Sequence, residues 1–405
     1  MTSSMAVTLG DVATFIRGIT FKPEDVVQVG TENSIACLRT KNVQAELDLS
    51  DVWAVDSSLV RRTNQYLQEG DILISSANSW NLVGKCSWIP VLPWKTSFGG
   101  FVSVLRANPE KIFPRFLFWW FSSARIQAMA RSFGNKTTSI SNLNVDRCLA
   151  LPLELPSLDE QKRISNIMDE SQLLKGCRIT SEEQLDDLFQ SVFLNLFEME
   201  GSGTWPVLTM AEIASKEAGS IRTGPFGSQL LVSEFVEQGV AVLGIDNAVS
   251  NEFSWGGRRY ITQEKYTELK RYTVRPGDFL VTIMGTCGRC AVVPDDIPLA
   301  INTKHLCCIS LDGNKCLPVY LHAFFLRHPM AKQYLMQKSK GAIMSGLNMG
   351  LIKDMPVILP PLEIQQQLSE KLKLIKSLKK SHRSYLEQLD SLFASLQHRA
   401  FRGEL

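Results

Sequence analysis

The 405-residue chain lacks long apolar runs, a strong charge imbalance and an N-terminal sorting signal. No stretch of about 18 apolar residues occurs, which predicts that no segment spans a membrane. Residues 1–10 show no basic region followed by an apolar core, as a secretory signal would require. The net charge is only +2 and does not predict a strongly basic or acidic tail. We therefore expect a cytoplasmic protein whose nine cysteines remain free thiols.

Compact catalytic motifs are also missing. The sequence contains no GxxxxGK[ST] phosphate loop, no GxGxxG after a strand, no HExxH, no GxSxG and no [ND]PP[YFW] methyltransferase motif. The best candidate for a metal is Cys287-Gly288-Arg289-Cys290, but a second ordered pair of ligands is absent. We therefore expect no catalytic, cofactor-binding or metal site. A nuclease or methyltransferase site built from scattered carboxylates stays open as an alternative.

An internal repeat is the most informative feature that is present. The sequence EQLD at 183–186 recurs at 387–390, and Gln161 matches Gln365 at the same offset of 204 residues. The helical parts keep this register better than the rest does. The pattern indicates a shared scaffold that carries two diverged globular parts.

Both halves follow one order of segments. Short apolar runs after Gly-Asp turns predict strands, and helical stretches follow at 114–132 and 318–340. Proline-punctuated links at 151–156 and 355–360 predict extended strands on the domain surface. The predicted divisions are a first globular domain at 1–150, a long helix and linker at 151–203, a second globular domain at 204–350 and a C-terminal long helix at 351–405.

Each half ends in a predicted helix of about 40 residues. Ser157 and Glu160 have the spacing of a capping box, Gly176 suggests a bend, and Gly201-Ser202-Gly203 marks the expected stop of the first helix. A helix with one narrow apolar stripe needs a partner, and chain order makes the two helices antiparallel neighbours. We predict an α+β fold with a pseudo-two-fold repeat, in which an antiparallel coiled coil separates two globular domains.

Several segments of the second half resemble the target-recognition domains of Type I restriction-modification specificity (S) subunits. They are GPFGS at 224–228, LGIDN at 243–247, GDFLVT at 277–282, GTCGR at 285–289 and LPPLEIQ at 359–365. The first half carries looser versions at 38–43, 70–74 and 155–161, and it lacks GPFGS.

This resemblance implies a non-catalytic subunit that recognises double-stranded DNA. Each half would read one half of a bipartite, asymmetric site. The coiled coil would set the spacer and dock two modification (methyltransferase) subunits, and restriction subunits would complete the complex. S-adenosylmethionine, ATP and magnesium would belong to those partners, with no cofactor in this chain. Two alternatives stay open: a related system whose modification and cleavage domains share one partner chain, and a coiled-coil scaffold that does not bind DNA.

Polar and basic residues of the predicted loops are the candidate DNA contacts, because Arg and Lys can bind guanine edges and Asn can bind adenine. Residues 1–150 and 204–350 each hold 15 Lys or Arg and 12 Asp or Glu, so we expect weak binding by the chain alone. In the first half the candidates are Arg39, Asn42, Ser76, Asn78, Trp80, Lys85, Asn135, Lys136 and Thr137. In the second half they are Arg222, Ser228, Asn247, Arg258, Arg259, Arg289, Asn302, Lys304, Lys340, Ser345 and Asn348. Trp119, Trp120 and Phe121 lie in a dense apolar run and are expected in the core instead.

Overall fold

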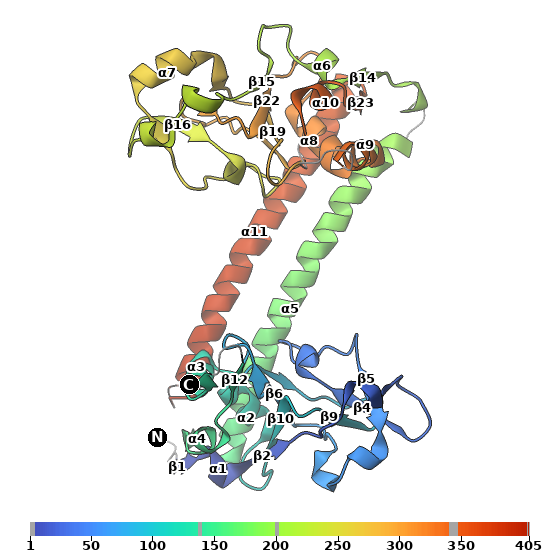
Figure 1. The fold of residues 1–405 in the computed structure, drawn as a ribbon, viewed down its shortest axis with the longest axis vertical. Helices are drawn as coiled ribbons and strands as arrows, with labels where there is room; N and C mark the ends of the chain where they lie inside the picture. The colour runs from blue at the N-terminus through green and yellow to red at the C-terminus, as the bar shows by residue number, and fades with distance from the viewer. Residues whose placement is uncertain (1–4, 137–139, 199–201, 340–346, 403, 405) are drawn as a thin grey trace. The chain divides into compact units, whose positions relative to one another are not determined.

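The computed structural model describes residues 5–136, 140–198, 202–339, 347–402 and 404, and the chain forms two compact units (Figure 1). The first unit comprises residues 1–179 and 384–405, and the second comprises residues 180–383. The boundary crosses both long helices, α5 (Leu158–Leu194) and α11 (Leu362–Ala400). Each unit therefore combines one globular part with a portion of both helices. The predicted four-part division instead treated each long helix as a separate segment.

Two four-stranded sheets form the globular part of the first unit. The antiparallel sheet has the order β2 (Ala13–Arg17), β10 (Val102–Ala107), β6 (Ile72–Ser75) and β8 (Cys86–Trp88). The mixed sheet has the order β3 (Val26–Val27), β5 (Trp53–Asp56), β4 (Ser34–Leu38) and β9 (Thr96–Phe98), with β4 and β9 parallel. Buried residues of both sheets, such as Leu73 and Phe98, share one apolar cluster, so the sheets pack face to face.

The second unit repeats this plan. Its antiparallel sheet has the order β15 (Ile221–Thr223), β22 (Leu306–Ile309), β19 (Phe279–Thr282) and β20 (Cys290–Val292). Its mixed sheet has the order β17 (Tyr260–Ile261), β16 (Val240–Leu243), β21 (Ala300–Asn302) and β18 (Thr273–Val274), with β16 and β21 parallel. The predicted internal repeat is therefore a repeat of sheet topology.

Smaller elements complete both units. Strands β7 (Ala77–Asn78), β11 (Asn135–Lys136) and β12 (Ser141–Asn142) form a small sheet in the first unit. The described part of the chain also holds five helices of four to seven residues: α1 (Leu9–Val12), α4 (Val145–Leu149), α6 (Met210–Ile213), α7 (Gln263–Leu269) and α10 (Met349–Lys353). Among the described residues, no helix combines the length and apolar composition needed to cross a membrane.

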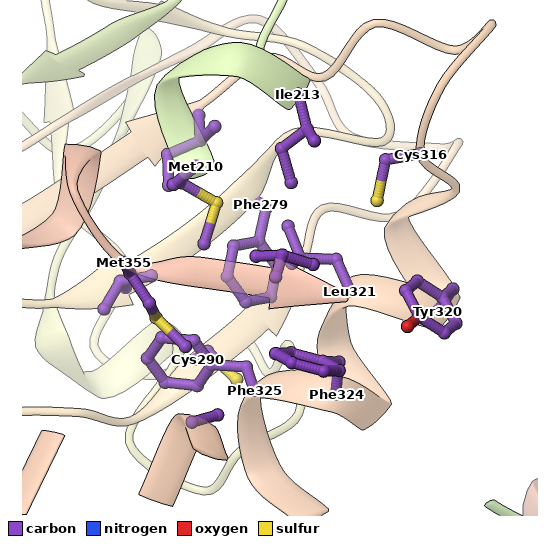
Figure 2. Close-up of a cluster of buried hydrophobic side chains, with 14 of the residues drawn as sticks. Met210, Ile213, Phe279, Cys290, Cys316, Tyr320, Leu321, Phe324, Phe325 and Met355 are labelled. Atoms are coloured by element: carbon purple, nitrogen blue, oxygen red, sulfur yellow. The ribbon is translucent and has the colours of Figure 1, made fainter. Parts of the chain in front are cut away.

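The main core of the second unit lies between its antiparallel sheet and its helices. Figure 2 shows Phe279 of β19 facing Leu321 and Phe325 of α8 (Pro318–Arg327). Successive strand residues point to opposite faces of a sheet. Cys307 accordingly lies in this core and Cys308 lies in the cluster between the two sheets.

The predicted helical stretches at 114–132 and 318–340 are each two helices. The first is α2 (Pro114–Phe121) and α3 (Ala124–Ser132), and the second is α8 and α9 (Pro329–Ser339). Ser123 is extended, and its hydroxyl donates to the Trp120 carbonyl at 2.7 Å. In the second unit Pro329 forces the preceding His328 out of the helical region. The buried Trp119, Trp120 and Phe121 confirm their predicted place in the core.

The proline-punctuated links are strands, as predicted. β13 (Pro152–Leu155) pairs with β1 (Met5–Thr8), and β23 (Pro356–Ile358) pairs with β14 (Val207–Thr209), both antiparallel. Each link is followed by a buried glutamine that confirms the repeat. Gln161 accepts a hydrogen bond from the Phe113 amide at 2.8 Å, and Gln365 accepts one from the Leu317 amide at 2.9 Å.

The two long helices have 37 and 39 residues, close to the predicted length. Helix α5 is continuous through Gly176 but ends at Leu194, before the predicted stop, and a short 3-10 turn follows it. The capping box is only half formed. The Ser157 hydroxyl accepts from the Glu160 amide at 3.4 Å, but the Glu160 carboxylate pairs with Arg163.

Within each unit the two long helices pair antiparallel, as predicted. In the first unit Lys175 of α5 bonds Asp390 of α11 at 2.5 Å. In the second unit Lys379 of α11 bonds Asp186 of α5 at 2.8 Å. Lys175 and Lys379 are repeat equivalents at an offset of 204, and so are the two aspartates, which end the EQLD sequences. The repeated tetrapeptide therefore supplies one half of a duplicated ion pair between the helices.

Candidate nucleic-acid interface

A 3-10 turn follows the parallel strand of each mixed sheet, at Thr40–Asn42 after β4 and at Ile245–Asn247 after β16. Asn42 and Asn247 are buried, and their Oδ1 atoms accept from the amides of Arg39 and Gly244 at 2.7 and 2.8 Å. Their Nδ2 atoms donate to carbonyls of the following loops. These two predicted adenine readers therefore use their amides to shape the loops.

Asn302 on β21 is also buried, and its Nδ2 donates to the Leu306 carbonyl at 2.9 Å. Its backbone lies against Gly224, where an added Cβ would meet the Asn302 carbonyl oxygen at 2.0 Å. In the first unit an added Cβ at Gly18 would meet the Gly99 carbonyl oxygen at 2.2 Å. Strand register makes Gly18 and Gly224 equivalent, so the GPFGS segment begins with a glycine that packing requires.

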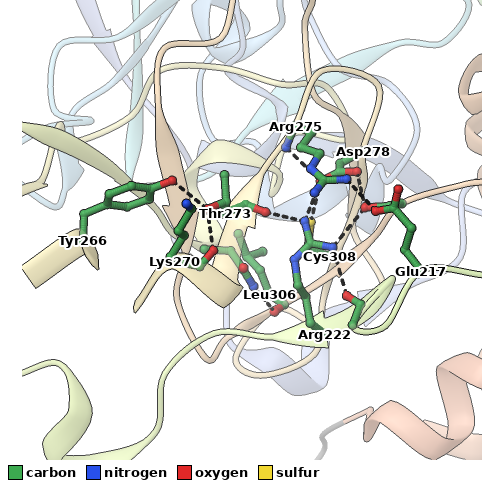
Figure 3. Close-up of polar contacts among 12 residues, drawn as sticks. Glu217, Arg222, Tyr266, Lys270, Thr273, Arg275, Asp278, Leu306 and Cys308 are labelled. Carbon is green, nitrogen blue, oxygen red and sulfur yellow. Dashed lines mark hydrogen bonds and ion pairs between the residues drawn. The ribbon is translucent and has the colours of Figure 1, made fainter. Parts of the chain in front are cut away.

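Arg222 takes part in a buried ion pair rather than a surface loop (Figure 3). Its guanidinium bonds the Asp278 carboxylate at 2.7 Å and also donates to the Ser310 hydroxyl at 3.0 Å and to the Thr273 carbonyl. Asp278 in turn accepts from the Arg275 amide at 2.9 Å. The network joins β15, β18 and the turn before β19.

The first unit holds the same ion pair with the arginine on a different strand. Asp71 bonds Arg106 of β10 at 2.6 Å, and Arg106 also donates to the Tyr66 carbonyl at 2.8 Å. Strand register places Ile16 at the position of Arg222, and Ser310 at the position of Arg106. The aspartate of the repeated Gly-Asp turn therefore pairs with one arginine in each unit. The two arginines lie on strands that are neighbours in the sheet.

Arg39 and Arg259 brace loops while remaining partly exposed. Arg39 stacks on Trp53, 3.5 Å from the ring centroid, and bonds Asp51 at 3.0 Å. Arg259 pairs with Asp246 of the 3-10 turn. Each arginine has a buried Nε atom without a hydrogen-bond partner among the described residues.

The hairpin loop of the first unit, residues 76–85 between β6 and β8, carries four predicted contacts. Ser76 and Asn78 are half-buried, Trp80 is 46% exposed, and Lys85 donates from Nζ to Gln44 Oε1 at 2.6 Å. The loop and the 3-10 turn enclose a pocket of about 270 Å³ lined by Thr40, Val43, Gln44, Ser75, Asn78, Leu82 and Lys85. The sequence prediction missed Gln44 and the neighbouring Phe101, which is 66% exposed.

The hairpin loop of the second unit, residues 283–289 between β19 and β20, is three residues shorter. Arg289 is exposed on it, and Lys304 is half-buried on the loop before β22. The pKa of His305 is lowered by burial and by the positive charges of Lys304 and Arg259. That pKa shift indicates that basic groups gather at this loop cluster, and His305 was missed because no motif surrounds it.

The remaining predicted contacts are dispersed. Arg258 is exposed, 5.8 Å from the Trp255 ring centroid, and Ser228 is exposed in a 3-10 turn. Asn348 caps α10 by accepting from the Leu351 amide at 2.9 Å. Asn135 and Lys136 lie on the short strand β11. Thr137, Lys340 and Ser345 lie outside the described residues.

The thiols near the Cys287-x-x-Cys290 sequence lie mainly in the core. Cys290, Cys307, Cys308 and Cys316 are buried, and burial raises the pKa of the Cys307 thiol to about 12. Within the described residues, no three His, Cys, Asp or Glu side chains are grouped to hold a metal ion.

Residues 2–187 and 238–389 match the family described as the Type I restriction modification DNA specificity domain. The chain belongs to this family. The two matches run from a globular part into a long helix, ending at residue 187 within α5 and at residue 389 within α11. In this specificity-domain protein the family match therefore includes the helices as well as the sheets.

Curated relatives of the specificity-domain protein span nearly the whole chain. It is 25% identical, over 97% of its length and 87% of the relative, to the Type I restriction enzyme EcoKI specificity subunit of Escherichia coli (strain K12). Its identity to the Type I restriction enzyme StySPI specificity subunit of Salmonella potsdam is also 25%, with coverage of 97% and 87%.

Solved structures share the fold of the specificity-domain protein. The S subunit of a type I restriction-modification system from M. genitalium matches with a TM-score of 0.57 and 14% identity, over 99% of this chain and 96% of that one. A chain from a structure on complex assembly and conformational transition of the type I R-M system matches with a TM-score of 0.61 and 15% identity, over both full lengths.

Proposed function

We propose that this chain is the non-catalytic DNA-recognition subunit of a Type I restriction-modification system and that it acts in the cytoplasm. Each unit would read one half of a bipartite, asymmetric site in double-stranded DNA. The observation that carries this proposal, together with family membership, is a duplicated scaffold with unlike loops. Two readers on one scaffold need the same strands and different loop side chains.

The proposed reading surface of each unit is the cluster formed by the 3-10 turn and the hairpin loop. Exposed or half-buried side chains of this cluster are available to base edges and phosphates. They are Asn78, Trp80 and Lys85 in the first unit, and Arg289, with Lys304 of the adjoining loop, in the second. Asn42, Asn247, Asn302 and Arg222 are assigned to the scaffold, because each side chain makes at least one hydrogen bond within the domain.

Two repeat-related patches on the long helices support docking of two copies of one partner. In the first unit, Leu174 precedes Lys175 and Leu392 lies two residues after Asp390, and both leucines are exposed. Exposed leucines on a paired helix are positions that a partner can cover.

The second unit repeats these positions. Leu378 precedes Lys379 and Leu188 lies two residues after Asp186, both leucines are exposed, and each is the repeat equivalent of one in the first unit. We assign the two patches to two modification subunits, which would bind S-adenosylmethionine. Restriction subunits, using ATP and magnesium, would join that complex.

Co-expression with the modification subunit, followed by mapping of methylated adenines, tests the proposed function. The expected result is one bipartite motif with two half-sites and a fixed spacer. The chain alone should bind the same DNA weakly, because few phosphates can be neutralised at a net charge of +2. Tight specific binding by the lone chain would contradict the need for the partner, and the absence of site-specific methylation would contradict the function.

A further inference from the structure

We propose that the residue after the left-handed glycine that closes each hairpin loop determines the base accepted at one position of the corresponding half-site. This residue is Lys85 in the first unit and Arg289 in the second. The inference rests on the proposed function, and it assigns guanine to both positions.

Backbone hydrogen bonds show that Lys85 and Arg289 occupy the same place. The amides of Gly84 and Gly288 each donate across the hairpin at 2.9 Å, to the carbonyls of Ser75 and Thr282. Both glycines have positive φ, +83° and +77°, which side chains rarely adopt. The carbonyls of Lys85 and Arg289 accept the return hydrogen bonds, from the amides of Ser75 and Thr282, at 2.8 Å in both units.

The following residues, Cys86 and Cys290, point into the apolar cores. Because side chains alternate along a strand, the basic side chain lies on the opposite face of the antiparallel sheet, the face that packs on the mixed sheet. Both hairpins thus place a cation on the side of the antiparallel sheet that faces the mixed sheet.

Each hairpin also rests on the 3-10 turn of its unit, which brings two loops to the basic side chain. In the first unit the pocket between them is lined by both loops, including Gln44 and Lys85. In the second unit an added Cβ at Gly285 would lie 3.2 Å from Ile245 of the turn.

The chemistry at both positions consists of donors, which suit the O6 and N7 acceptors of guanine. Gln44 Nε2 donates to the Lys41 carbonyl at 2.9 Å, so its oxygen is directed to Lys85 Nζ. One of the three ammonium donors is thereby held, and the other two are left for a ligand. Arg289 presents a planar fork that can bind both guanine acceptors together.

The two units therefore offer different versions of one contact. Lys85 is anchored in a polar pocket, whereas Arg289 is exposed on a shorter loop. We expect the second half-site to discriminate more strictly at its guanine position, because a bidentate contact constrains geometry more than a single ammonium does.

The test compares methylation maps for the chain co-expressed with its modification subunit. Lys85→Ala should relax one G·C position in one half-site, with discrimination falling about tenfold or more. Arg289→Ala should relax one G·C position in the other half-site. Lys85→Arg and Arg289→Lys should keep guanine. The matched controls are Lys95→Ala and Arg271→Ala, which remove cations elsewhere in the same units and should leave the motif unchanged.

Three outcomes would overturn the inference while the wild-type chain still gives a bipartite motif. They are an unchanged motif in both alanine variants, a uniform loss of methylation without relaxed specificity, and a wild-type half-site without any G·C position. Co-purification of each variant with the modification subunit shows that it folds. If the wild-type chain directs no bipartite methylation, the proposed function fails instead.

Discussion

At the residue scale, the buried Asp–Arg pair is the clearest mark of how the two units diverged. Asp71 and Asp278 keep the same place in a Gly-Asp turn, but the arginine lies on β10 in one unit and on β15 in the other. A buried charge without its partner is costly, so the loss of one arginine requires the gain of another. The arrangement suggests that the aspartate fixes the turn in both units.

This exchange predicts a rescue experiment. Arg222→Ile should lower the free energy of unfolding of the second unit by about 3 kcal/mol, because Asp278 is left buried and unpaired. Adding Ser310→Arg reproduces the arrangement of the first unit and should restore more than half of that loss. Urea unfolding of the two variants and the wild type measures both effects.

Arg258→Ile serves as the control, since that side chain is exposed, and it should change stability by less than about 0.5 kcal/mol. No recovery in the double variant would contradict the equivalence of the two ion pairs.

The sequence distinguishes core from surface well, but it does not distinguish polar residues that shape a loop from polar residues that contact bases. The buried tryptophans were predicted from their apolar neighbours, whereas Asn42 and Asn247 were predicted as base readers. One signal was present in the repeat, because an asparagine occurs at the same place in LRTKN and LGIDN. An identical residue at equivalent positions of two units that read different DNA sequences belongs to the scaffold. Residues that contact bases should differ between the units.

At the element scale, helices and linking strands were predictable because their patterns are local. The pairing of the sheets was not, since β4 joins β9 and β16 joins β21 across long separations in the sequence. The pocket at Gln44 depends on such pairing, so no local sequence pattern indicates it. The break after Phe121 was missed because apolar residues continue beyond it, and the break after Arg327 was missed although Pro329 marks it in the sequence.

The ion pair of Asp186 predicts a pH dependence for helix pairing. Burial raises the pKa of this carboxyl, but Lys379 and Arg327 outweigh it and hold the pKa below 3.8. A lowered folded pKa stabilises the second unit above the unfolded pKa, and this contribution is lost as the pH falls through the folded pKa. Asp186→Asn should therefore reduce the free energy of unfolding at pH 7. It should also make that free energy fall less steeply as the pH drops below about 4.

Urea midpoints between pH 3 and pH 7 provide the measurement, and Asp187→Asn, on the exposed side of α5, is the control. Equal pH profiles for Asp186→Asn and the wild type would refute the role of the pair.

At the scale of the whole molecule, the repeated leucine patches predict stepwise loss of partners. Leu174→Glu with Leu392→Glu should remove one modification subunit from the complex, because a carboxylate would be buried at the docking surface. Leu188→Glu with Leu378→Glu should remove one as well, and the fourfold variant should bind none. Native mass spectrometry of the co-expressed complex counts the copies.

Leu374→Glu is the control for general effects of charge, because Leu374 is exposed and has no leucine at its repeat equivalent, Glu170. Retention of two copies in the fourfold variant would place docking elsewhere.

Helix length predicts the spacer of the DNA site. Inserting seven residues into both α5 and α11, after residues 179 and 383, adds about 10 Å to each helix, or about three base pairs of DNA. Methylation mapping should then find a longer spacer between unchanged half-sites. An unchanged spacer would show that the helices do not act as the ruler.

The relocated arginine also limits where natural or engineered recombination can join the two halves. A chimera that takes β2 from the first half and β22 from the second would bring Ile16 together with Ser310, and its aspartate would have no cation. The reciprocal chimera would bring Arg106 and Arg222 to a single carboxylate. A stable chimera must therefore take both of these strands from the same half, whereas the hairpin between them can come from either half.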